Sequence, residues 1–217
     1  MDGNGRWANA RGLKRTKGHE KGAEVIREIT TYCAAHPTIE SATFYAFSTE
    51  NWKRPKMEVE FLMKMLDKHL KNELPTYQEN GIRFLAIGDL DAFSKPLRER
   101  IRKTEELTKE NSKLTQILAL NYGGRAEITM AVNKLLAEGK REVTQHDISG
   151  ALQTPYRDID LLIRTSGEQR LSNFLLWQLS YSELAFTETL WPDFTTQELE
   201  EIIHDYQHRT RRFGGVK

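Results

Sequence analysis

Short apolar runs recur along the chain, separated by longer segments in which apolar residues lie three or four positions apart. Short runs rich in β-branched and aromatic residues are typical of buried strands, whereas the three-to-four spacing is typical of helices with one buried face. The predicted strands are 42–47, 82–87, 115–120, 159–163 and 183–187. The predicted helices begin near Gly18 and then cover 57–73, 95–110, 124–138, 144–152, a short segment at 174–177, and 195–212.

The helix predicted over 57–73 carries a wider apolar surface than one packing seam needs. Val59, Leu62, Leu66 and Leu70 form one stripe, and Pro75 should end the helix. Two readings of this surface stay open. It is part of the ordinary core, or some of it lines an apolar channel between this helix and the sheet, where a bulky residue at Leu66 would shorten a bound chain.

Strands that are apolar throughout and alternate with helices predict an α/β fold with a mostly parallel central sheet covered by helices. No repeat, low-complexity tract or linker divides the sequence, so residues 1–217 are expected to form one domain. Ligands of such sheets bind beyond the carboxyl ends of the strands. The polar segments 48–54, 121–125 and 164–172 follow predicted strands, which makes that edge the expected site.

Composition and charge narrow the class of protein. The formal net charge of +1 provides no global field that would recruit nucleic acid, and no nucleic-acid partner is expected. Cys33 is the only cysteine, which excludes internal disulfides and thiolate zinc clusters and fits a reducing cytosol. No apolar run approaches the length of a membrane span. A cytoplasmic protein is expected, with transient contact at the inner membrane surface left open.

The first eight residues concentrate unusual chemistry. Asp2 is followed by Gly3, Asn4, Gly5, Arg6 and Trp7. Glycines let the backbone approach a ligand closely, a carboxylate can hold Mg2+ together with phosphates and waters, and a guanidinium can bind phosphate oxygens with two hydrogen bonds. The alternative is a frayed terminus with Asp-Gly and Asn-Gly turns. On local composition alone the alternative is favoured.

Two further segments could complete an anion site. Between Asp2 and Gly22 the chain has six Lys or Arg and two acids, a local balance of +4, ahead of a predicted helix start near His19. The alternative there is a solvated basic loop. Residues 48–55 join hydroxyl, amide, carboxylate and guanidinium groups to Trp52. The alternative there is a helix N-cap, although capping needs no tryptophan.

If the strand ends meet at one edge, five guanidiniums, a histidine and two carboxylates gather there. This set suits two diphosphate groups and one Mg2+. Its members are Arg6, Arg15, His19, Arg54, Arg164, Arg170, Asp2 and Glu183.

Several blocks together resemble one family. They are DGNGRWA at 2–8, GH at 18–19, FSTENWKRP at 47–55, NYGGR at 121–125, RTSGEQRLSNFLLWQ at 164–178 and WPDF at 191–194, followed by RRFGG at 211–215. In content and order they resemble the cis-prenyltransferases, most of all the bacterial members that make undecaprenyl diphosphate. The resemblance runs from the first residues to the last block.

The resemblance implies a Mg2+-dependent transferase that extends farnesyl diphosphate with successive isopentenyl diphosphate units, each new double bond being cis. It implies a homodimer with a six-stranded parallel sheet and an apolar tunnel. The implied product is undecaprenyl diphosphate, precursor of the lipid carrier for peptidoglycan and other cell-wall polysaccharides.

The resemblance also implies residue roles. Asp2 corresponds to the essential Mg2+-binding aspartate, Glu183 to a second metal-associated carboxylate and Asn51 to the position usually assigned as proton acceptor. A neutral amide is a poor base, so Asn51 is expected to position the proton or the substrate while a diphosphate oxygen accepts it. The allylic diphosphate site corresponds to Gly3, Asn4, Gly5, Arg6, Trp7, Arg15 and His19. The mobile loop corresponds to Ser48, Thr49, Glu50, Trp52 and Arg54, and the isopentenyl diphosphate site to Arg164, Arg170, Leu171 and Ser172.

One departure from the family pattern affects the fold. A short apolar strand normally precedes the position of Met1, so five strands are expected here, and Asp2 should lose a backbone anchor. Two rival functions stay open. A non-catalytic partner subunit should lack Asp2 or the arginines, which this sequence has, together with the block at 212–214 that in relatives reaches toward the active site. A nucleotide-binding Rossmann protein should show G-x-G-x-x-G after a strand, which this sequence lacks.

Overall fold

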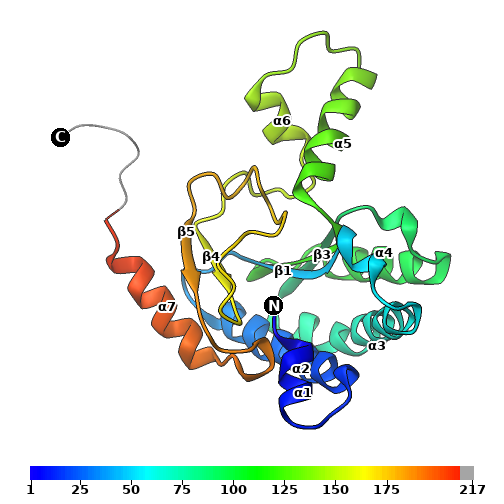
Figure 1. Ribbon diagram of the computed structural model, residues 1–217. Helices are drawn as coiled ribbons and strands as arrows, with labels where there is room; N and C mark the ends of the chain where they lie inside the picture. The colour runs from blue at the N-terminus through cyan, green and yellow to red at the C-terminus, as the bar shows by residue number, and fades with distance from the viewer. Residues whose placement is uncertain (211–217) are drawn as a thin grey trace.

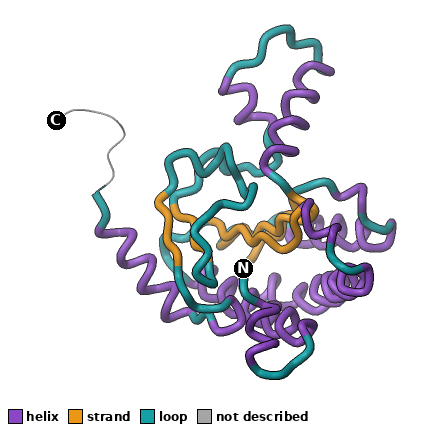
Figure 2. The backbone as a smooth tube through the Cα atoms, viewed as in Figure 1, coloured by secondary structure: helices purple, strands orange, loops and turns teal. Residues whose placement is uncertain are grey.

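Five parallel-paired strands form two sheets within residues 1–210, the part of the chain that the computed structural model describes. β1 (Ser41–Ser48), β3 (Leu114–Tyr122) and β2 (Ile82–Ile87) form one sheet in that order. β4 (Leu161–Arg164) pairs with β5 (Glu183–Phe186) in the other. Helices cover the strands (Figures 1 and 2). The predicted single-domain α/β fold with a parallel sheet is confirmed.

The two sheets are separated by a gap between β1 and β4. Residues of both strands line the same cavity, and Met1 lies there with them. The expected number of five strands is confirmed for the described residues, but these strands do not form one continuous sheet.

The helices pack around this frame. They are α1 (Asn4–Ala10), α2 (Arg15–Ala35), α3 (Lys56–Asn80), α4 (Lys95–Thr108), α5 (Gly124–Ala137), α6 (Gln145–Ala151) and α7 (Thr196–His208). α5 and α6 project from the body as a helical arm, and α7 runs along the side of β5 (Figure 1). No helix within residues 1–210 combines the length and apolar character needed to cross a lipid bilayer.

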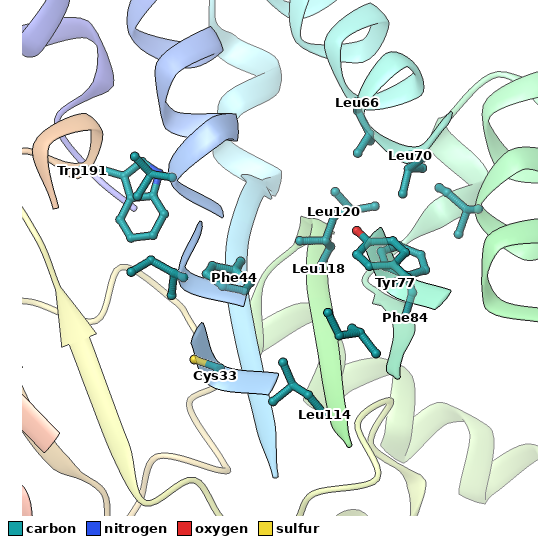
Figure 3. Packing of buried hydrophobic residues seen from close by; sticks show 14 of the residues in the cluster. Cys33, Phe44, Leu66, Leu70, Tyr77, Phe84, Leu114, Leu118, Leu120 and Trp191 are labelled. Atoms are coloured by element: carbon teal, nitrogen blue, oxygen red, sulfur yellow. The ribbon is translucent and has the colours of Figure 1, made fainter. Parts of the chain in front are cut away.

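The main core lies between the sheet and the helices α2, α3, α4 and α7. Tyr77 of α3 stacks on Phe84 of β2 with 5.7 Å between ring centroids, and Phe44 of β1 meets the edge of Trp191 at 6.2 Å (Figure 3). Leu66 and Leu70 are buried in the same cluster. The buried face of α3 in this part is therefore packed core.

The end of α3 differs from the sequence prediction. The helix continues through Pro75 to Asn80 and stops at Gly81, whose φ of 64° suits a residue without a Cβ. Proline inside a helix loses one backbone hydrogen bond. Burial of Leu70 and Tyr77 on either side of Pro75 outweighs that loss, because both side chains belong to the main core.

Two other predictions need correction. Residues 174–177 form turns instead of a short helix, and Leu175 has a positive φ of 40°. Phe174 and Leu175 are apolar because they fill a second buried cluster under β3 and β4. The final helix ends at His208 instead of 212, and the block at 212–214 lies outside the described residues.

Candidate active site

Asp2 is fixed at the carboxyl end of β4 by its own backbone. The Thr165 hydroxyl accepts a hydrogen bond from the Asp2 N–H at 2.9 Å and donates to the Asp2 carbonyl at 2.9 Å. The N–H of Trp191 donates to the same carbonyl at 2.9 Å. The expected loss of a backbone anchor is therefore wrong, because the loops after β4 and β5 supply one.

The carboxylate of Asp2 faces Arg164. An Arg164 Nη2 donates to Asp2 Oδ2 at 3.1 Å, and the Gly3 N–H donates to Oδ1 at 2.7 Å. Burial acts to raise the pKa of the Asp2 carboxyl, but these hydrogen bonds and the charge of Arg164 outweigh it and hold the pKa below its ordinary value. Asp2 is therefore ionised at neutral pH, with 43% of its side chain exposed.

Gly3 makes the turn from Asp2 into α1. Its φ is +101°, and a Cβ there would lie 2.9 Å from a Leu190 side-chain carbon and 3.0 Å from the Ser166 Cβ. Any other residue would be strained and would push this loop away from β4. The chain therefore turns at Gly3 into the short helix α1, where the sequence indicated only a glycine-rich segment.

The loop after β4 gathers the remaining residues of this side. Arg164 also donates to the Arg170 carbonyl and to Ser172 Oγ, the latter at 2.8 Å. Arg6 donates to the Ser166 carbonyl at 3.0 Å, and both Arg6 and Arg170 pair with Glu168. The two blocks of the sequence motif, 2–8 and 164–178, therefore meet.

A cavity of about 1300 Å³ opens beneath these groups. Its polar end contains Asp2, Ser48, Glu50, Asn51, Arg54, Arg125, Arg164, Arg170, Ser172 and Asn173. Its apolar wall comes from α2, β1 and α7, and includes Ile29, Cys33, Phe44, Leu199 and Ile203. Leu171 also lines the cavity, on the side of β4. Leu66 of α3 does not line it, so the open apolar space lies beside α2 and α7, away from the region expected next to the 57–73 helix.

The loop from β1 to α3 forms the other side. Residues Thr49–Lys53 make a short 3-10 helix whose N-cap is Ser48, and Asn51 Oδ1 accepts from the Ser48 N–H at 3.2 Å in a capping box. The Trp52 Nε1 donates to Asn121 Oδ1 at 2.7 Å, and its indole contacts Phe47 and Phe93. The predicted helix N-cap is confirmed. Ser48, Glu50, Asn51 and Arg54 also line the cavity, and the role of this segment as a ligand loop stays a prediction. Thr49 lies next to Gly123, whose added Cβ would be 3.0 Å from the Thr49 hydroxyl.

Three cationic or donor groups converge on Glu58 in the first turn of α3. Arg54 Nη1 lies 3.1 Å from Glu58 Oε1, Arg15 Nη2 lies 3.5 Å from it, and His19 Nε2 also 3.5 Å. Burial acts to raise the pKa of the Glu58 carboxyl, but the charges of Arg15 and Arg54 outweigh it, and the pKa lies below its ordinary value. Burial, with the charge of Arg54, lowers the pKa of His19, so the imidazole is neutral at pH 7.

Gly5 and Asn4 bring α1 against this cluster. A Cβ on Gly5 would lie 2.7 Å from an Arg15 nitrogen, so glycine allows the guanidinium to pack on α1. Asn4 contacts α2 through its carbonyl, which would lie 1.9 Å from a Cβ on Gly18. The helices α1 and α2 therefore depend on small residues where they cross.

Two predicted site residues lie elsewhere. Trp7 donates from Nε1 to Asp193 Oδ1 at 2.6 Å and carries Arg11 over its ring at 4.4 Å, which anchors α1 to the segment after β5. Glu183 starts β5 opposite Leu161 and pairs with Arg209 at 3.0 Å. Arg164 lies three positions further along β4 than Leu161, a rise of roughly 10 Å, so Glu183 does not join Asp2 within the described chain.

Of the two predicted metal ligands, Asp2 lines the cavity and Glu183 does not. Within residues 1–210 no three or more His, Cys, Asp or Glu side chains gather as a metal-binding group. An ionised, half-exposed carboxylate beside a cavity still fits Mg2+, which commonly takes one or two protein carboxylates and completes its shell with phosphates and waters. The roles of Asp2 and Glu183 as ligands stay predictions.

Sequence reasoning missed three residues of this arrangement. Thr165 anchors Asp2, Asn173 donates to Glu50 Oε1 at 3.2 Å, and Glu58 pairs with the cations. Only the Glu58 contact could have been predicted from the sequence, because Glu58 follows Arg54 by four positions at a helix start, and charged residues with that spacing interact. The other two act across more than a hundred residues of chain.

Comparisons with known proteins show which family the chain is similar to. The family model described as "Putative undecaprenyl diphosphate synthase" matches residues 1–214. An isoprenyl transferase of Wolinella succinogenes is 54% identical over 217 residues, covering 100% of this chain and 94% of that protein. An isoprenyl transferase of Helicobacter pylori is 52% identical, covering 100% and 95%.

Two solved structures share the fold. A lavandulyl diphosphate synthase from Lavandula x intermedia, in complex with dimethylallyl diphosphate, superimposes with a TM-score of 0.93 at 37% identity and covers 99% of this chain and 95% of that one. A probable undecaprenyl diphosphate synthase from Campylobacter jejuni gives 0.83 at 38% identity, covering 90% and 93%. The chain belongs to the undecaprenyl diphosphate synthase family of cis-prenyltransferases and is an enzyme of isoprenoid biosynthesis.

Proposed function

We propose that the chain extends farnesyl diphosphate with isopentenyl diphosphate in successive cis condensations, giving undecaprenyl diphosphate, precursor of the lipid carrier for peptidoglycan. The observation that carries the proposal is the contact between Asp2 and Arg164 at the polar end of a large, partly apolar cavity. If Asp2 lay far from Arg164 and Arg170, or if that cavity were absent, the assignment would fail.

Two separate cation sets support two diphosphate sites. Arg164 and Arg170 lie beside Asp2, while Arg15 and Arg54 meet at Glu58. From the family resemblance we assign the first set to isopentenyl diphosphate and the second, with the glycine turn at Gly3, to the allylic diphosphate. Fixed guanidiniums stabilise the charge that builds on a departing diphosphate, and two held substrates react as if joined.

Asp2 would hold Mg2+ together with diphosphate oxygens. Bound Mg2+ neutralises charge on the leaving diphosphate. The chain's own contribution is to keep the Asp2 carboxylate ionised and aimed, through Arg164 and the Gly3 N–H. The side-chain oxygen of Asn51 already accepts a hydrogen bond from the Ser48 N–H. This supports a positioning role for Asn51, with a diphosphate oxygen accepting the proton.

The prenyl tail would leave water for the apolar wall of the cavity. Each added unit is hydrocarbon and gains free energy by burial against side chains such as Ile29 and Ile203. Release of such a product is the reason to propose transient contact with a membrane surface. A homodimer is proposed because β5 ends its sheet and exposes Leu184 and Phe186 on one face, which a second copy could cover.

The test is a radiolabel assay with farnesyl and isopentenyl diphosphates, with and without Mg2+, with products separated by thin-layer chromatography. We expect long polyprenyl products that need Mg2+, and a loss of at least about a thousandfold in kcat for Asp2→Asn, since the metal ligand is weakened while the fold is kept. The matched control, Asp91→Asn, changes an exposed carboxylate and should keep full activity. No product under any condition would favour the non-catalytic partner subunit.

A further inference from the structure

Glu58 sits where an anion would be expected, among cations that the proposed function assigns to a diphosphate. Its Oε1 is the common neighbour of Arg15, His19 and Arg54, at 3.1–3.5 Å. Its side chain is 14% exposed, so the carboxylate is largely enclosed by them. A single carboxylate faces two permanent cations and one imidazole.

The contacts of Glu58 are loose by the standard of the same molecule. Arg27 and Glu73 also join α2 to α3, and there the Arg27 Nε lies 2.9 Å from each Glu73 oxygen. Such short, two-oxygen contacts are the geometry of a strong guanidinium–carboxylate pair. Glu58 instead offers one oxygen, Oε1, to its three neighbours, at distances of 3.1–3.5 Å.

The two pairs differ in geometry more than in burial. The Glu73 and Glu58 side chains are 3% and 14% exposed, and their partners Arg27 and Arg15 are exposed to a similar extent, 49% and 53%. Because the guanidiniums next to Glu58 reach solvent, water screens part of their attraction to it. With one oxygen engaged at longer distances, the Glu58 carboxylate is held less firmly than that of Glu73.

A phosphate group offers these partners more than the carboxylate does. It brings more oxygens and more charge to two guanidiniums, whose planar donors match phosphate geometry. His19 adds a buried Nε2 that lies 3.5 Å from Glu58 Oε1 without forming a hydrogen bond to it. A buried polar nitrogen without a partner is costly, and a phosphate oxygen would satisfy it.

We propose that Glu58 is a built-in counter-anion: its carboxylate holds the position among Arg15, His19 and Arg54 that one phosphate group of the allylic diphosphate takes, and it moves out when that group binds. The assignment to the allylic substrate rests on the proposed function. Before the substrate binds, the Glu58 carboxylate keeps the three groups in place. The affinity for diphosphates is lower as a result, because the carboxylate must be displaced, and its return helps diphosphate to leave.

The test is calorimetric binding of inorganic pyrophosphate to the full chain in EDTA, so that no metal takes part. We expect Glu58→Gln to bind pyrophosphate about three- to tenfold more tightly, because one negative charge next to a multiply charged ligand at a partly exposed site is removed. Glu60→Gln is the matched control. It makes the same charge change on the same helix, but Glu60 is exposed and pairs only with Lys56 at 3.9 Å among the described residues. Its affinity should stay within about twofold of the starting protein.

Two further variants make the result decisive. Glu58→Ala should also tighten binding, and thermal melts show that each variant is folded. In an Arg15→Gln background, the gain from Glu58→Gln should shrink, which identifies the site. Unchanged or weaker binding in folded Glu58→Gln and Glu58→Ala would overturn the proposal and make Glu58 a support for the arginines.

Turnover gives an independent readout. A displaced counter-anion predicts that Glu58→Gln lowers KM for the allylic diphosphate and also lowers kcat where diphosphate release limits the rate, whereas a purely structural role predicts a higher KM. If the starting protein binds pyrophosphate as expected but makes no prenyl product, the proposed function fails and the counter-anion proposal stands for a general diphosphate site.

Discussion

The two sides of the candidate site are held in different ways. On the anchored side, Asp2 is fixed by three backbone hydrogen bonds, to Thr165 and Trp191, and its carboxylate receives the Gly3 N–H and Arg164. On the loop side, comprising Ser48–Arg54, Arg15, His19 and Glu58, the groups meet through side chains on separate elements. The anchored side is held by backbone contacts, and the loop side by contacts between side chains.

This difference fits what the proposed function asks of each side. A carboxylate that holds a metal must be aimed before the reaction, because reorganisation would cost transition-state stabilisation. A side through which a charged substrate enters must open and close, and side-chain contacts break more easily than a backbone anchor. Rigidity near Asp2 and adaptability near Glu58 are therefore complementary parts of one site.

The largest expected effect comes from breaking the anchored side at Thr165. Thr165→Val removes the hydroxyl of a residue that is 2% exposed, and this hydroxyl serves both the N–H and the carbonyl of Asp2. We expect a loss of about 1–3 kcal/mol in the free energy of unfolding, because the Asp2 N–H loses its partner and the Asp2 carbonyl keeps only the Trp191 N–H. We also expect a fall of about tenfold or more in kcat, because the Asp2 carboxylate would no longer be held in position.

Urea unfolding and steady-state kinetics measure both effects. Thr129→Val is the control, since that hydroxyl bonds to its own helix at the exposed Arg125 carbonyl. It should change stability only slightly and leave kcat alone. Full activity in Thr165→Val would mean that Asp2 is positioned by Arg164 without the backbone anchor.

The sequence predicts the elements of the fold better than it predicts the anchored side. All five strands lie within a few residues of the apolar runs, since strands buried in a parallel sheet must be apolar. The same rule misleads at 174–177, where Phe174 and Leu175 are buried in turns. Apolar residues in a sequence indicate burial. They indicate a helix or a strand only when they also recur with the spacing of that element.

The site shows the same limit. Glycines, arginines and Asp2 stand out by residue type, so the candidate set could be assembled from composition and position. Thr165 and Asn173 are ordinary polar residues whose importance comes from contacts across 163 and 123 positions. Glu183 shows the opposite case, because its residue type suits a metal but its place opposite Leu161 separates it from Asp2.

A smaller effect is expected on the loop side at Trp52. Trp52→Phe keeps an aromatic ring against Phe47 and Phe93 but loses the hydrogen bond to Asn121. We expect a loss of about 0.5–1.5 kcal/mol in the free energy of unfolding. We also expect a rise of a few-fold in KM for the allylic diphosphate, because the loop would spend more time open.

Trp177→Phe provides a matched comparison for Trp52→Phe. It loses an indole hydrogen bond of 2.9 Å to Ser149, near α6 and away from Asp2. Thermal melts should shift by similar amounts for both variants, while KM should rise only for Trp52→Phe. Equal KM values in the two variants would show that the Trp52 contact serves folding alone and that the loop side is as rigid as the anchored side.

The smallest effect concerns pH and the loop side. Burial, together with the charges of Arg54 and Arg15, lowers the pKa of His19 below its ordinary value of 6.5, and Glu58 opposes the shift only in part. The unfolded chain therefore takes up a proton as the pH falls through 6.5, while the folded chain resists it. Stability that is fully present above that pH is lost below it.

Urea unfolding at pH 7.5 and pH 5.5 measures this loss. His19→Gln should lose less stability between the two pH values than the starting protein, and the remaining difference should include His69, whose pKa burial also lowers. Arg54→Gln should give a smaller loss as well, because removing that charge lets the pKa of His19 rise. If His19→Gln kept the full pH dependence, the imidazole would already be free to charge in the folded chain. The loop side would then be open to water around His19, and its cations would need no counter-anion to stay together.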